Sequence, residues 1–127
     1  MAVVLVVDDD EFTCDAIRRL LSRMGYTTEC AHSGTAALNL LERMKPSIIV
    51  LDWMMPKMDG LEVLKKLRAD PKTKDVPVLI YSAADDAAMR QQAAKLGAKE
   101  CVLKSGGFYP LYERIERYAA EAPSVPN

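Results

Sequence analysis

The sequence lacks several features that mark particular classes of protein. Its 127 residues carry 17 basic and 18 acidic side chains, and a net charge of −1 leaves no basic excess for nucleic acid or an anionic membrane. Its apolar runs are only as long as a strand, which predicts neither a transmembrane helix nor the apolar core of a signal peptide. We therefore expect no direct contact with nucleic acid and no insertion into a membrane.

Cysteine is also scarce. Cys14, Cys30 and Cys101 are odd in number and widely spaced, so they match neither a disulfide framework nor a zinc motif. A reducing compartment fits this usage, and we expect the protein to be cytoplasmic. The length predicts one domain, large enough to form a stable core without metal or disulfide cross-links.

Short apolar runs divide the chain. Unbroken runs at residues 3–7, 47–51 and 76–81 are typical of strands buried on both faces, and weaker strand candidates lie at 27–31 and 100–103. Segments with apolar residues at three- and four-residue intervals separate these runs and predict helices. Five strands alternating with five helices favour a doubly wound parallel sheet with helices on both faces.

Side chains that can cap a helix precede the predicted helices. We interpret Asp10, Ser33 and Asp59 as caps of the first three helices, and Asp85 as the cap of a fourth helix over residues 86–96. That fourth helix has a thin apolar stripe, which predicts weak and adjustable packing. We assign residues 1–122 to the domain and residues 123–127 to a flexible tail or the start of a linker.

Polar side chains follow four of the predicted strands. Asp8 and Asp9 follow the first, Asp52 the third, Ser82 the fourth and Lys104 the fifth. The carboxyl ends of parallel strands meet at one edge of the sheet, so we expect these groups to converge. Clustered carboxylates repel one another unless a cation such as Mg²⁺ neutralises them. A carboxylate beside that ion can attack a phosphoryl group, whose oxygens the ammonium and hydroxyl would stabilise.

Two motifs carry a resemblance to a known family. The segments Val6-Val7-Asp8-Asp9 and 51–60 resemble those of response-regulator receiver domains of two-component signalling, over about residues 3–118. The chain is similar in size to the stand-alone chemotaxis type. The resemblance implies a flavodoxin-like (βα)5 fold with strand order 2-1-3-4-5. It also implies a signalling switch and not an enzyme.

The resemblance also implies roles for individual residues. Asp52 matches the phosphoacceptor, which takes its phosphoryl group from a sensor histidine kinase or a phosphotransfer protein. Asp8, Asp9 and Asp52 match carboxylates of the Mg²⁺ site, with Mn²⁺ as a substitute and Asp8 acting through a water. The backbone carbonyl of Met54 matches a further metal ligand.

Ser82 and Lys104 match the residues that bind the phosphoryl group, and Ser82 shifts on activation in that family. Ala83 and Ala84 belong to the loop expected to move with it. Met54 and Ala84 flank the site with groups that cannot orient a water, which predicts slow self-dephosphorylation. The changed surface would then meet a downstream protein.

Two positions depart from the family pattern. Cys101 occupies the place of an aromatic switch residue, and Tyr81, Phe108 or Tyr109 are candidates to substitute for it. Ser105 stands where proline follows the lysine, and we predict a trans Lys104–Ser105 bond because cis bonds before other residues are costly.

These departures favour one alternative, a receiver-like binding module that works without phosphorylation, although the intact acidic set opposes it. An aspartyl phosphatase is disfavoured, because Met54 stands where such enzymes need a second aspartate.

Overall fold

The computed structural model describes residues 2–119, within which five strands alternate with five α-helices as predicted. The strands are β1 (Val3–Val7), β2 (Thr27–Ala31), β3 (Ile48–Leu51), β4 (Val78–Ser82) and β5 (Glu100–Leu103). The helices are α1 (Glu11–Arg23), α2 (Gly34–Leu41), α3 (Gly60–Ala69), α4 (Ala87–Lys95) and α5 (Phe108–Ala119), with a 3₁₀ turn, η1 (Lys104–Gly106), before the last. The predicted domain end at 122 and the tail over 123–127 lie outside the described residues.

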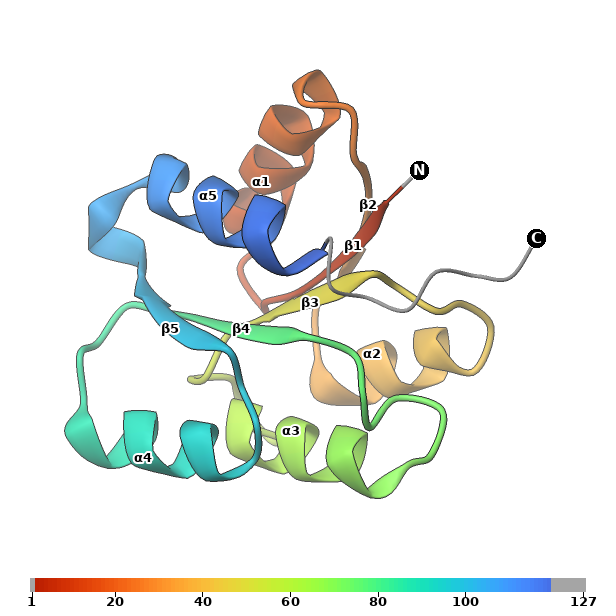
Figure 1. Ribbon diagram of the computed structural model, residues 1–127, viewed down its shortest axis with the longest axis vertical. Helices are drawn as coiled ribbons and strands as arrows, with labels where there is room; N and C mark the ends of the chain where they lie inside the picture. The colour runs from red at the N-terminus through yellow and green to blue at the C-terminus, as the bar shows by residue number, and fades with distance from the viewer. Residues whose placement is uncertain (1, 120–127) are drawn as a thin grey trace.

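The strands form one parallel sheet in the order β2-β1-β3-β4-β5, which confirms the predicted fold class. The register pairs Val7 with Leu51, Leu51 with Ile80 and Ser82 with Leu103, so the strands end along a common edge. In Figure 1, α1 and α5 cover one face of the sheet, and α2, α3 and α4 cover the other. The strand order reverses between β1 and β3, which makes their carboxyl ends the expected place for a site.

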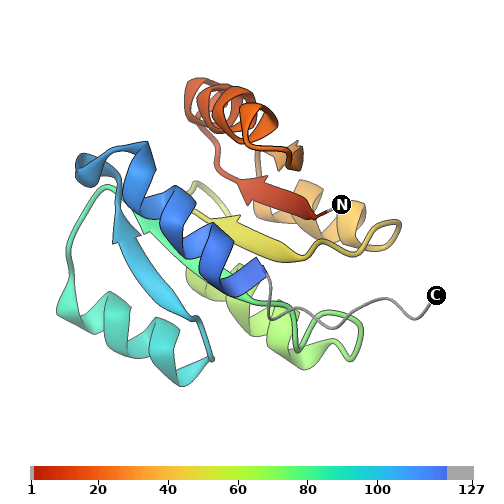
Figure 2. The ribbon, with the colours of Figure 1, turned by 45° about the horizontal axis from the view of Figure 1, so that its top comes forward.

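Each face of the sheet has its own core. Val4 and Val6 pack with the residues of α1 and α5, whereas Leu5 and Val7 pack with those of α2, α3 and α4. Alternate residues of a strand point to opposite faces, so a strand covered on both sides must be apolar throughout. This explains the unbroken apolar runs in the sequence, and Figure 2 shows the two helical layers on either side of the strands.

Three of the four predicted helix caps are confirmed. The side chains of Asp10, Ser33 and Asp59 accept hydrogen bonds from backbone N–H groups in the first turns of α1, α2 and α3. The predicted cap of the fourth helix was wrong. Asp86 caps α4, because its carboxylate accepts from the first turn while the Asp85 carboxylate is paired with the guanidinium of Arg90.

Within residues 2–119, no helix combines the length and the apolar character needed to cross a bilayer.

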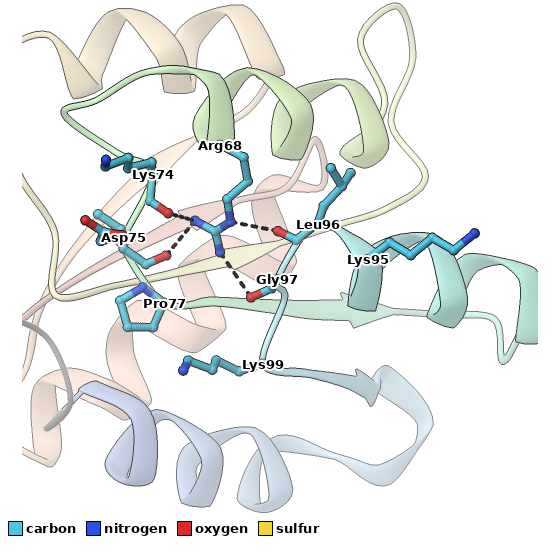
Figure 3. A pocket seen from close by; sticks show the side chains of 9 residues that line it. Arg68, Lys74, Asp75, Pro77, Lys95, Leu96, Gly97 and Lys99 are labelled. Atoms are coloured by element: carbon cyan, nitrogen blue, oxygen red, sulfur yellow. Dashed lines mark hydrogen bonds between the residues drawn. The ribbon is translucent and has the colours of Figure 1, made fainter.

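The C-terminal end of α4 is held by a side chain from α3. Arg68 donates from Nε to the carbonyl of Leu96 at 2.7 Å and from Nη2 to that of Gly97 at 3.2 Å. Its Nη1 donates to the carbonyls of Lys74 at 2.9 Å and Val76 at 3.0 Å, in the loop before β4 (Figure 3). One guanidinium thus joins α3, the end of α4 and the loop before β4. A cation at a helix C-terminus is favourable.

We predict that Arg68→Met lowers the free energy of unfolding by about 1–3 kcal/mol, because several backbone carbonyls lose their donor. Urea denaturation followed by circular dichroism measures the change. Arg19→Met is the matched control, since Arg19 is exposed and, among residues 2–119, its ion-pair partner is Asp15 on the same helix surface. Equal effects of the two substitutions would contradict the role assigned to Arg68.

Candidate functional site

The structure brings three carboxylates together at the reversal point of the strand order. Asp8 and Asp9 follow β1, Asp52 follows β3, and carboxylate oxygens of all three lie within 4.8 Å of one another. Asp8 and Asp52 are 2% and 5% exposed, whereas Asp9 is exposed to solvent. Two of the three carboxylates are therefore buried, and they lie close to each other.

The backbone holds the two buried carboxylates in place. Asp8 Oδ1 accepts from the N–H of Asp10 at 2.9 Å, and Asp52 Oδ1 accepts from the N–H of Met54 at 3.3 Å. The N–H of Asp52 continues the sheet by donating to the carbonyl of Val7 at 2.9 Å. Strand ends and their first turns thus fix the positions of both side chains.

Lys104, the first residue of η1, reaches into this cluster. Its Nζ lies 2.8 Å from Asp8 Oδ2 and 3.7 Å from Asp52 Oδ1, and its side chain is 23% exposed. Burial lowers the pKa of Lys104, but the hydrogen bond to Asp8 and the charge of Asp52 outweigh burial and raise it overall. The ammonium therefore stays charged beside the carboxylates.

One ammonium does not balance three carboxylates. Burial, followed by the charge of Asp8, raises the pKa of Asp52 to about 6 despite the opposing effect of Lys104. The cluster therefore carries excess negative charge and presents several carboxylate oxygens. Both properties suit a hard divalent cation, which prefers oxygen ligands. Asp8, Asp9 and Asp52 are the side chains that could hold it.

Ser82 is buried at the end of β4, but its hydroxyl is engaged within its own loop. The Oγ atom donates to the carbonyl of Ala84 at 3.1 Å and accepts from the N–H of the same residue at 3.2 Å. Ala83 and Ala84 are exposed. The structure therefore places Ser82 on the predicted edge, with its hydroxyl bonded to Ala84.

The geometry agrees with a comparison against known families. Residues 4–116 match the family model described as "Response regulator receiver domain". The chain belongs to this family. Receiver domains are the signalling switches of two-component systems, so the family implied by the motifs of the sequence is confirmed.

Individual proteins give the same result. The response regulator MprA of Mycobacterium ulcerans is 39% identical over 112 residues, which cover 88% of this chain and 47% of MprA. The receiver domain thus spans about half the length of the curated relatives it matches.

Solved structures agree. The chemotaxis protein CheY4 of Vibrio cholerae superposes with a TM-score of 0.88 at 28% identity, covering 93% of this chain and 98% of CheY4. The response regulator TrrA of Thermotoga maritima, solved in complex with Mg²⁺ and BeF, has a TM-score of 0.81 at 30% identity, covering 93% and 99%.

The structure also places Met54 and the two positions that depart from the receiver pattern, Cys101 and Ser105. Met54 extends its side chain into solvent, with 69% exposed. Cys101 is partly buried on the α4 side of the sheet, where its Sγ lies 3.8 Å from Met89 Sδ. The Lys104–Ser105 bond is trans as predicted, since residues 2–119 contain no cis peptide.

Two residues that contact the backbone of Asp8 were not predicted from the sequence. Cys14 Sγ donates to the backbone carbonyl of Asp8 at 3.4 Å, and His32 Nδ1 lies 3.2 Å from the same oxygen. These contacts join separate elements through a main-chain atom, so no spacing in the sequence signals them.

We predict that Asp52→Asn stabilises the metal-free receiver domain at pH 7, by on the order of 3 kcal/mol. The pKa of Asp52 in the folded state, about 6, lies above its ordinary value of 3.8, so the folded state binds the proton more tightly. The free energy of unfolding of the parent therefore falls as the pH rises from 3.8 to about 6. Asparagine does not ionise, so the variant does not lose this stability. Urea denaturation with EDTA at several pH values measures it.

The stabilisation should disappear near pH 4, where Asp52 is protonated in the parent. Asp10→Asn is the control, because Asp10 is exposed and asparagine caps a helix as well as aspartate does. A parent as stable as Asp52→Asn at pH 7 would show that the buried charge of Asp52 is compensated within the chain.

Proposed function

We propose that this receiver domain is a phosphorylation-controlled switch in which Asp52 accepts a phosphoryl group from a histidine kinase or a phosphotransfer protein. One observation carries the proposal: Asp52 is a buried carboxylate that faces Asp8 and Lys104 at the carboxyl edge of the sheet. A nucleophile, a site for a cation and a fixed ammonium are the parts that phosphoryl transfer requires.

Asp8, Asp9 and Asp52, with the backbone carbonyl of Met54, would hold Mg²⁺, and Mn²⁺ would substitute for it. The ion supplies positive charge to the oxygens of the transferring phosphoryl group. TrrA, a relative that is 30% identical, was solved with Mg²⁺ and BeF, which supports this assignment.

The chain's own groups perform the remaining steps. A carboxylate oxygen of Asp52 attacks phosphorus, the P–N bond to the donor histidine breaks, and the imidazole leaves with the bonding electrons. Lys104 binds a phosphoryl oxygen from its place 3.7 Å from Asp52 Oδ1. Ser82 gives up its hydrogen bonds to Ala84 and donates to another phosphoryl oxygen, which moves the loop of residues 82–84.

Helix α4 follows that loop and has little apolar anchoring, because Met89 and Ala93 are its buried residues. A change at Ser82 would therefore alter the surface around the start of α4. A downstream protein would recognise the altered surface.

We predict that incubation with acetyl phosphate and Mg²⁺ adds one phosphoryl group to the parent and none to Asp52→Asn. Intact-mass spectrometry measures the gain, and EDTA should abolish it because the carboxylates then repel the phosphate. Asp10→Asn, which alters a carboxylate of the same acidic run, should be loaded like the parent. A parent that gains no mass would favour a binding module that works without phosphorylation.

We also predict slow loss of the phosphoryl group, over minutes or longer, because the side chains of Met54 and Ala84 cannot orient an attacking water. Met54→Asn should shorten the lifetime, since its amide can hold a water near the acyl phosphate. Met24→Asn, at another exposed methionine, is the matched control. Intact mass followed after removal of the donor measures the decay, and a parent lifetime of seconds would contradict the prediction.

A further inference from the structure

A buried tyrosine connects β4 to the turn that carries Lys104. Tyr81 directly precedes Ser82, is 7% exposed, and donates from its hydroxyl to the carbonyl of Gly107 at 3.2 Å. The N–H of Gly107 in turn donates to the carbonyl of Lys104 at 3.1 Å. These two hydrogen bonds close the η1 turn and tie it to the central sheet.

The ring of Tyr81 also lies beside the lysine side chain. Lys104 Nζ is 5.9 Å from the centre of the ring, within the range of a cation–π contact. The same ammonium is 2.8 Å from the carboxylate of Asp8, so it is near both the aromatic ring and its ion-pair partner. Tyr81 is thus linked to Lys104 in two ways, by its ring to the ammonium and by the hydrogen bonds of Gly107 to the lysine backbone.

The η1 turn depends on such a connection. It has three residues and is followed by Gly107, whose φ of +80° favours glycine. Ser105, unlike proline, does not restrict the backbone of the turn, and short 3₁₀ turns have poor hydrogen-bond geometry. A side chain anchored in β4 can limit the freedom that the two glycines at 106 and 107 introduce.

Tyr81 and Cys101 lie on opposite faces of the sheet. Tyr81 packs with the core beneath α1 and α5, whereas Cys101 packs with the core beneath α4. A connection through Tyr81 therefore reaches the start of α5, and not the surface of α4.

We propose that Tyr81 is a positioning residue for Lys104, an inference that rests on the proposed phosphorylation of Asp52. Its hydroxyl holds the η1 turn so that the ammonium faces Asp8 and Asp52. Because Tyr81 is the chain neighbour of Ser82, a shift of Ser82 on phosphorylation also reaches η1 and the start of α5 through this hydrogen bond.

The first test is hydrogen exchange of Tyr81→Phe, which keeps the ring and removes the hydroxyl. Amides of residues 104–107 should exchange about three- to tenfold faster than in the parent, the range expected for one lost hydrogen bond. The control is Tyr112→Phe, because the Tyr112 hydroxyl bonds to Glu116 on the exposed side of α5. Equal exchange in the two variants overturns the inference.

The second test is a double-mutant cycle on the rate of loading by acetyl phosphate with Mg²⁺. Tyr81→Phe should slow loading about three- to tenfold in the parent and have no further effect in Lys104→Ala, because its action passes through the lysine. A merely structural hydroxyl would slow both backgrounds by the same factor, which overturns the inference.

The outcomes also separate the inference from the function on which it rests. A parent that is loaded at the same rate as Tyr81→Phe overturns the role of Tyr81 and leaves the phosphorylation of Asp52 in place. A parent that is never loaded overturns the proposed function, and with it the role assigned to Tyr81, whatever the exchange of residues 104–107.

Discussion

The repulsion among Asp8, Asp9 and Asp52 is the constraint on which the site depends. The sheet places these carboxylates within 4.8 Å of one another and buries two of them, an arrangement that costs stability when the charges are not balanced. Lys104 offsets part of this cost, but burial first and the charge of Asp8 second still raise the pKa of Asp52. The carboxyl edge of the sheet thus carries more negative than positive charge, and a bound cation can neutralise the excess.

Much of the fold follows from short-range rules. The apolar runs indicate strands covered on both faces. Capping side chains mark the starts of three helices because the backbone N–H groups that donate to them lie within a few residues. The same rule failed where Asp85 and Asp86 stand side by side. Either could cap α4, and the choice depends on Arg90, which pairs with Asp85 from the next turn of the helix.

The acidic residues of the site could be predicted for a related reason. Asp8 and Asp52 follow strands that are adjacent in the sheet, so fold class alone brings them together. The supports of the site could not be predicted. Cys14 and Tyr81 act on the backbone carbonyls of Asp8 and Gly107, and a backbone atom leaves no mark in the sequence of its partner.

The hydrogen bonds of Arg68 to Leu96 and Gly97 anchor α4 at its C-terminal end. From this anchored end the helix, nine residues or about 13 Å long, extends back to the loop of Ser82. A tilt of α4 by about 10° around its C-terminal end would displace its first turn by about 2 Å and its last turn hardly at all. Any displacement of α4 would therefore be largest at its N-terminal end, next to the loop of Ser82 that the proposed phosphorylation of Asp52 would move.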